Sequence, residues 1–286
     1  MPSISSPVSV ELFPHDSVKE NRFDLLTTPK PAKAVQNQGK VYLVGAGTGD
    51  PELLTIKAYK TILQADVICY DNLVSDEILA LNTTAEKIYV GKKCHKHSMS
   101  QQDINGLLVT LAQQGKTIVR LKSGDPFIFG RGGEEMQTVI SAGVACESIA
   151  GITTALAVAN SVNIPLTHRD YAQSVKFVTG FLKADTPNEQ YAELLAHNQT
   201  VVFYMGLNTL PNLTQGLLQA GKSADTPFAI IANVSRPNEQ VLVATLSTIQ
   251  ASQNDAKLPS PAVMIMGDVV SLYHQLNAPT LTYAAL

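Results

Sequence analysis

The sequence contains no tryptophan, and aromatic residues make up only 6% of its 286 positions. Its three cysteines, Cys69, Cys94 and Cys146, lie far apart and include no CxxC pair. An odd number of scattered cysteines argues against a disulfide framework and fits a reducing compartment. We therefore expect a cytoplasmic protein whose stability rests on a hydrophobic core, which the 45% content of hydrophobic residues can supply.

The chain also lacks an excess of positive charge. Its formal net charge is −3, which argues against a general nucleic-acid-binding protein. The N-terminus shows no positive region followed by an apolar one, so no secretion signal is expected. The uncharged run from Ser148 to Thr167 has spanning length, but Asn160, Asn163 and Pro165 interrupt it. We therefore expect a buried helix and turn there, and no membrane partner.

Two kinds of segment follow one another along the chain. Residues 1–38 scatter prolines without a sustained period, which predicts a disordered tail. From Lys40 onward, apolar strands alternate with helical segments, which predicts an α/β fold rich in parallel strands. We expect two α/β domains, residues 39–165 and 166–286, with a hinge between Asn163 and Asp170. Strands are expected over residues 41–44, 66–70, 87–90, 117–121, 146–149, 175–179, 200–205, 227–232, 240–244 and 262–266.

Two sites carry the signature of a helix start. Asp50 followed by Pro51 matches an N-cap with proline in the first helical position. Ser100 followed three residues later by Asp103 resembles a capping box. Apolar residues at positions 104, 107, 108 and 111 then fall on one helical face.

Two glycine-rich segments follow predicted strands, residues 45–50 and 123–133. Such segments expose backbone N–H groups at the carboxyl end of a strand, where open α/β sheets bind ligands, although either could be a plain turn. Asp71, which ends the second strand, would contact a ribose hydroxyl in an NAD enzyme. The glycine spacing is G-x-G-x-G and departs from the G-x-G-x-x-G of that class.

Nine segments together resemble the tetrapyrrole methylases, and among these the members that act on uroporphyrinogen III. In chain order they are VYLVGAGTGDPELLT, YDNLVS, YVGKK, LKSGDPFIFGRGGEE, GITTA, IPLTHRDY, VTG, VFYMGL and VMIMGD. The resemblance implies two α/β domains with the active site in the cleft between them, usually in a homodimer. It also implies S-adenosylmethionine as methyl donor, S-adenosylhomocysteine as product, and two methylations that give precorrin-2 for siroheme or cobalamin synthesis.

The resemblance also implies roles for individual residues. Asp71 and Lys92 match a proton acceptor and a proton donor. The donor site would comprise Thr48, Ser123, Gly124, Asp125, Ile128, Thr153, Thr154, Met205 and Val234. The carboxylates of the substrate need local cations, for which the candidates are Lys93, His97, Arg131, His168 and Arg169. No metal site is expected, because Cys94, His95 and His97 are crowded into one short run.

The sequence departs from the family pattern at four positions. Thr48 stands where relatives mostly have proline, Ser123 replaces a glycine, Ala150 a proline and Phe181 a histidine. If the backbone at Ser123 needs a positive φ, we expect strain there.

Some relatives carry a dehydrogenase and ferrochelatase module before the methylase, and the short segment before Lys40 leads us to expect that those activities are absent. An NAD-dependent oxidoreductase and a catalytically idle tetrapyrrole-binding protein remain as alternatives.

Overall fold

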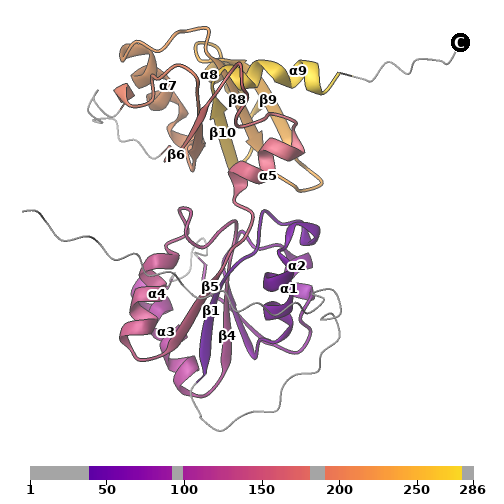
Figure 1. Ribbon diagram of the computed structural model, residues 1–286, viewed down its shortest axis with the longest axis vertical. Helices are drawn as coiled ribbons and strands as arrows, with labels where there is room; N and C mark the ends of the chain where they lie inside the picture. The colour runs from indigo at the N-terminus through magenta and orange to yellow at the C-terminus, as the bar shows by residue number, and fades with distance from the viewer. Residues whose placement is uncertain (1–38, 92–98, 181–190, 279–286) are drawn as a thin grey trace, which may run out of the picture. The chain divides into compact units, whose positions relative to one another are not determined.

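The computed structural model describes residues 39–91, 99–180 and 191–278, which form two five-stranded sheets with flanking helices (Figure 1). The first sheet has the strand order β3-β2-β4-β1-β5. Its strands are β1 (Lys40–Gly45), β2 (Val67–Tyr70), β3 (Glu86–Tyr89), β4 (Thr117–Lys122) and β5 (Ala145–Ile149). All neighbouring strands in this sheet are parallel. The prediction of a parallel-rich α/β fold is confirmed for this half of the chain.

Helices cover both faces of the first sheet (Figure 1). On one face lie α1 (Ile56–Leu63) and α2 (Asp76–Ala80), where Ile62 and Ile78 pack against Leu121. On the other lie α3 (Gln101–Gln113) and α4 (Gly132–Ser141), where Leu108 and Val139 pack against Leu43. Strands that are buried on both faces read as continuous apolar runs, which is why the sequence located them well.

Both predicted helix starts are observed, but only one of them opens an α-helix. The capping box at α3 is formed, since Ser100 Oγ accepts from the Asp103 N–H and Asp103 accepts from the Ser100 N–H. The start predicted at Asp50 caps only η2 (Pro51–Leu53), a single turn of 3₁₀ helix. Leu54 is extended, which interrupts the helical hydrogen bonds. The α-helix begins at Ile56, with Thr55 Oγ1 accepting from the Ala58 N–H at 3.1 Å.

The second sheet has the strand order β6-β7-β10-β8-β9. Its strands are β6 (Ser174–Thr179), β7 (Gln199–Tyr204), β8 (Pro227–Ala232), β9 (Gln240–Thr245) and β10 (Ala262–Met266). The β6–β7 pair is parallel, but the β7–β10, β10–β8 and β8–β9 pairs are antiparallel. The prediction of a parallel-rich fold is therefore wrong for this half. The connection from β8 to β9 is too short for the crossover that parallel strands require.

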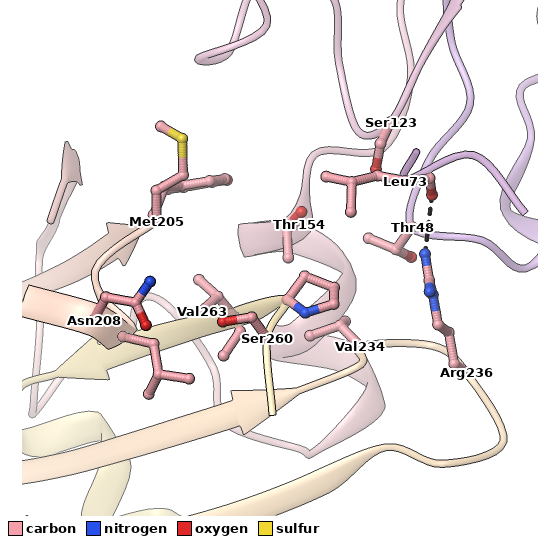
Figure 2. Close-up of a pocket in the computed structure, with 14 residues that line it drawn as sticks. Thr48, Leu73, Ser123, Thr154, Met205, Asn208, Val234, Arg236, Ser260 and Val263 are labelled. Atoms are coloured by element: carbon pink, nitrogen blue, oxygen red, sulfur yellow. Dashed lines mark hydrogen bonds between the residues drawn. The ribbon is translucent and has the colours of Figure 1, made fainter. Parts of the chain in front are cut away.

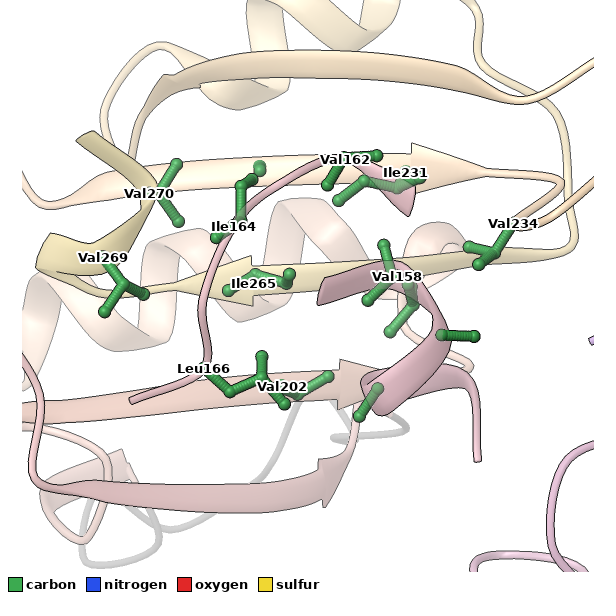
Figure 3. Close-up of a cluster of buried hydrophobic side chains, with 14 of the residues drawn as sticks. Val158, Val162, Ile164, Leu166, Val202, Ile231, Val234, Ile265, Val269 and Val270 are labelled. Atoms are coloured by element: carbon green, nitrogen blue, oxygen red, sulfur yellow. The ribbon is translucent and has the colours of Figure 1, made fainter. Parts of the chain in front are cut away.

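Helical elements also cover this sheet. They are α5 (Thr154–Ser161), η3 (Leu207–Thr209), α7 (Leu210–Gln219), α8 (Ile249–Ala256), η4 (Asp268–Leu272) and α9 (Tyr273–Leu276). Figure 3 shows Val158 of α5 and Ile164 in one hydrophobic cluster with Ile265 of the second sheet. The segment 163–170, which was expected to be a hinge, therefore begins with residues such as Ile164 that are packed in this core. The domain boundary at 165 stays a prediction, and this packing favours an earlier one, before Thr154.

Candidate active site

Glycine-rich loops that follow three parallel strands meet at the carboxyl edge of the first sheet. Gly47, after β1, and Gly124, after β4, exchange backbone hydrogen bonds of 2.6 and 3.2 Å. A Cβ on Gly45 would collide with the backbone of Gly151, which follows β5. Asp125 locks this arrangement by accepting from the Gly151 N–H at 3.1 Å. The strand order makes these loops neighbours, so the predicted ligand loops do come together.

A pocket of about 410 Å³ opens beside these loops, and we call it the main pocket (Figure 2). Loops and strand ends of both sheets line it, together with the first residue of α5 and part of η3: Thr48, Leu73, Ser123, Thr154, Tyr204, Met205, Leu207, Asn208, Val234, Arg236, Ser260, Pro261, Ala262 and Val263. Five of the nine predicted donor-site residues are among them: Thr48, Ser123, Thr154, Met205 and Val234. The other four, Gly124, Asp125, Ile128 and Thr153, lie in or next to the same loops.

The wall of the main pocket contains a buried side-chain hydroxyl, that of Thr48, with no hydrogen-bond partner among the described residues. Thr48 is 6% exposed, and its Oγ1 has no hydrogen-bond partner within the described ranges. A buried hydroxyl without a partner costs about 1–3 kcal/mol. A ligand with a polar atom within reach of this hydroxyl would remove that cost.

Residues that sequence reasoning missed also line this pocket. Arg236 donates from Nη2 to the backbone carbonyl of Leu73 at 2.9 Å, as the dashed line in Figure 2 marks. Tyr204 lies at the end of β7, directly before Met205. Leu73 and Tyr204 belong to the motifs YDNLVS and VFYMGL, so the motifs held a signal for them, but no local pattern singles out Arg236.

The backbone around the pocket is strained at several side-chain-bearing residues. Met205, Asn233 and Ser235 adopt positive φ values of 56°, 54° and 61°. Such conformations concentrate at functional sites, where the surrounding structure holds them. Ser123 is not among the non-glycine residues with positive φ in the described ranges, so the strain expected there is absent. The positive φ belongs to its neighbour Gly124, at 69°.

A second, open hollow of about 620 Å³ lies next to Met205, and we call it the phenylalanine hollow. It is lined by Phe127, Phe129, Arg131, Gly132, Gly133, Glu134, Thr179 and Met205. The apolar side chains are well exposed, at 54% for Phe127, 42% for Phe129 and 55% for Met205. Exposed apolar side chains that are grouped in one place are typical of a surface that binds a ligand or a partner.

Arg131, predicted to bind substrate, already has a partner in this hollow. Its Nε and Nη2 bond the carboxylate of Glu134 at 3.1 and 2.6 Å. This pairing raises the pKa of Arg131 and lowers that of Glu134. Both side chains are more than half exposed, and exposed pairs are weak. An anionic ligand can therefore compete for the guanidinium.

Asp71 lies directly after β2 and connects to a buried charge network. It accepts from the Leu73 N–H at 3.2 Å, and Arg120 Nη2 lies 3.5 Å from its carboxylate. Arg120 and Lys122, both on β4, reach the same oxygen of fully buried Glu135, at 3.3 and 3.0 Å. Burial, together with the charge of Arg120, lowers the pKa of Lys122. No sequence pattern predicted this network, because isolated charges in a strand usually face solvent.

The remaining predicted residues lie elsewhere or outside the described residues. Lys92, Lys93 and His97 fall outside the described residues. His168 sits in a turn where its Nδ1 accepts from the Asp170 N–H at 3.1 Å, and Arg169 is exposed beside it. Neither residue is among those that line the main pocket or the phenylalanine hollow. Their role in substrate binding stays a prediction.

In the described part of the chain, no three His, Cys, Asp or Glu side chains are placed to hold a metal ion. No helix there has the length and apolar character to cross a membrane.

Fold and loops together define an α/β protein whose glycine-rich loops meet at the carboxyl ends of its strands, which is the edge where open α/β sheets bind ligands. The chain belongs to the Tetrapyrrole (Corrin/Porphyrin) Methylases, the family that matches residues 40–250.

Its relatives include the siroheme synthase of Psychrobacter cryohalolentis, which is 54% identical over 250 residues, covering 87% of this chain and 48% of that protein. The chain spans about half the length of such curated relatives. A uroporphyrin-III-C-methyltransferase structure from Thermus thermophilus is 37% identical with a TM-score of 0.72, covering 84% of this chain and 99% of that one. A structure of the Thermus enzyme complexed with S-adenosylhomocysteine is 38% identical with a TM-score of 0.70, covering 82% of this chain and 100% of that one.

Proposed function

We propose that this chain transfers methyl groups from S-adenosylmethionine to two pyrrole carbons of uroporphyrinogen III, giving precorrin-2. The observation that carries the proposal is the main pocket, where residues of the donor motifs meet around a buried hydroxyl without a partner among the described residues. The choice of substrate is supported by the Thermus uroporphyrin-III-C-methyltransferase, which is related over nearly its whole length.

The donor would lie in the main pocket, held by Thr48, Ser123, Gly124, Asp125, Ile128, Thr153, Thr154, Met205 and Val234. S-adenosylmethionine supplies a methyl group on a positively charged sulfur. The neighbouring glycine backbones allow close approach of such a ligand. Thr48 and Ser123 add side-chain hydroxyls to the wall that the corresponding family residues, mostly proline and glycine, do not have.

The macrocycle would lie in the phenylalanine hollow. Phe127, Phe129 and Met205 offer exposed apolar contacts to its faces. Arg131 would exchange the carboxylate of Glu134 for one of the substrate. Lys93, His97, His168 and Arg169 are proposed as further cations for the remaining carboxylates. Met205 lines both hollows, so donor and acceptor would meet at this residue.

Methyl transfer depends mainly on the alignment of the acceptor carbon, the methyl group and the sulfur. Orientation alone can lower the activation barrier by several kcal/mol. A proton must afterwards leave the macrocycle, and a carboxylate at the carboxyl edge of the first sheet can accept it. We assign that role to Asp71 and assign proton donation to Lys92. Arg120 would hold the Asp71 carboxylate in position through the ion pair between them.

Binding and turnover experiments test the proposal against the two alternatives. Calorimetry should detect S-adenosylhomocysteine binding and no comparable binding of NAD. Single-turnover reaction of S-adenosylmethionine with uroporphyrinogen III should yield precorrin-2. Tighter binding of NAD would favour the oxidoreductase, and donor binding without methyl transfer would favour the idle binding protein.

The wider setting of the activity is part of the same proposal. We place the product in siroheme synthesis, as the names of the relatives suggest, with cobalamin synthesis as the other route. We also propose a homodimer in the cytoplasm, with no nucleic-acid or membrane partner. Light scattering of the purified chain and fractionation of cells test these points, and a monomeric mass or a membrane-bound pool would contradict them.

A further inference from the structure

Tyr204 occupies the junction between the main pocket and the phenylalanine hollow. It lines the main pocket, and the next residue, Met205, lines both spaces. Its ring lies 4.9 Å from that of Phe129, which lines the phenylalanine hollow. Burial raises the pKa of the Tyr204 phenol, so the hydroxyl keeps its proton at neutral pH.

On the donor side, Tyr204 fixes the start of α5. Its hydroxyl accepts from the Ala155 N–H at 2.9 Å and lies 2.7 Å from Thr153 Oγ1. Because the hydroxyl accepts from Ala155, its own proton is free to bond Thr153. Thr153 is the N-cap residue of α5, and it makes no side-chain capping bond of its own. Tyr204 therefore satisfies a helix N–H that Thr153 would otherwise cap, and it holds the wall residue Thr154 in place.

On the acceptor side, Tyr204 supports a strained loop. Phe129 has a φ of 50° and Arg131 a φ of 59°, in the left-handed region that side-chain-bearing residues rarely adopt. Such strain persists only where neighbouring contacts hold it. The tilted ring contact with Tyr204, at 48° between the planes, is one such contact.

We propose that Tyr204 is a positioning residue for methyl transfer, acting through Thr153 toward the donor and through Phe129 toward the acceptor. This inference rests on the proposed function. Methyl transfer depends on the alignment of two ligands held by different loops, so a residue that touches both loops sets their register.

The test separates the hydroxyl from the ring. Tyr204→Phe removes the bonds to Thr153 and Ala155 but keeps the ring beside Phe129. We expect S-adenosylhomocysteine affinity to fall about fivefold to tenfold, because the start of α5 and the wall residue Thr154 are no longer held in position. The single-turnover rate with both substrates saturating should fall by about tenfold as well. Phe129→Leu should instead raise the KM for uroporphyrinogen III and leave S-adenosylhomocysteine affinity unchanged.

Tyr191→Phe is the matched control. Tyr191 is a buried tyrosine of the same half, and its hydroxyl donates to the carbonyl of Asn212 at 3.4 Å, away from both hollows. This variant should change the melting temperature and neither ligand readout. A Tyr204→Phe enzyme that is less stable but has wild-type affinity and rate would overturn the proposal, as would lost affinity with an unchanged saturated rate. Failure of the wild-type chain to bind S-adenosylhomocysteine would refute the proposed function and this inference together.

Discussion

Two buried threonines have a side-chain hydroxyl without a hydrogen-bond partner among the described residues, and they differ in one respect. Thr48 lines the main pocket, whereas Thr200 lies inside β7 and is not among the residues that line it. Thr48→Val should raise the stability of the ligand-free protein by roughly 1 kcal/mol, because it removes an unsatisfied polar group. It should also weaken S-adenosylhomocysteine binding about fivefold, because the ligand loses a hydrogen bond. Denaturant unfolding and calorimetry measure the two effects.

Thr200→Val is the control for that pair of measurements. It should stabilise the protein by a similar amount and leave ligand affinity unchanged. Equal affinity of the Thr48→Val variant and the wild type would show that the Thr48 hydroxyl contacts no ligand.

Asp71 gives the second prediction at the scale of a single residue. Asp71→Asn can still accept from the Leu73 N–H but loses its charge beside Arg120. A proton-transfer role predicts a kcat lower by about 10²-fold or more in single-turnover methylation. Donor affinity and melting temperature should stay near wild type.

Asp66→Asn is the matched change, since Asp66 lies before β2 and bonds the Thr117 N–H at the opposite end of the strand. It should leave the rate unaltered. Rates for Asp71→Asn within about threefold of wild type, well under 1 kcal/mol in barrier, would remove Asp71 from the chemistry.

At the scale of elements, β4 and α4 are joined by buried charge. Glu135→Gln would leave Arg120 and Lys122 buried without their carboxylate. We expect a loss of about 3–5 kcal/mol in the free energy of unfolding, the scale for breaking a buried pair. Glu86→Gln, which breaks the exposed pair with Lys116, should cost less than about 1 kcal/mol. Similar losses for both variants would mean that the buried network contributes little.

A second link between elements predicts a pH dependence. Glu147 of β5 accepts from Lys40 of β1 and Lys57 of α1, each at 2.6 Å, and these bonds lower its pKa from the ordinary 4.5. A lowered carboxyl pKa stabilises the folded state above pH 4.5, and the gain is lost as pH falls through the folded value. Because the groups are partly exposed, the gain should be no more than about 1 kcal/mol.

Denaturant unfolding at two pH values checks this sign. Glu147→Gln should be less stable than wild type at pH 7, and the difference should shrink as the pH is lowered to 3. A difference that persists in acid would point to packing and not to charge.

At the scale of the whole molecule, loops and strand ends of both sheets line the main pocket. S-adenosylhomocysteine at about 100 times its dissociation constant should therefore stabilise the protein by roughly 2.7 kcal/mol. Differential scanning calorimetry should show the melting transition moving upward with S-adenosylhomocysteine and staying in place with NAD. An equal shift with NAD would contradict the assignment of the donor.

The sequence by itself determined the local elements and the glycine-rich loops proposed to bind the donor. Apolar runs located the strands, Ser100 and Asp103 located the start of α3, and the glycine segments after β1 and β4 marked the loops that meet at the carboxyl edge of the first sheet. These features depend on neighbours within a few residues, so periodicity and capping chemistry reveal them.

Tertiary structure decided what depends on contacts between distant segments. The direction of the strands in the second sheet depends on the path of the connections between them. The packing of α5 depends on the apolar face of the sheet against which it is buried. The same holds for Tyr204, whose hydroxyl meets α5, for Arg236, and for the burial of Lys122 against Glu135. A side chain's partner across the fold is fixed by packing and burial, because one sequence pattern is compatible with many long-range pairings.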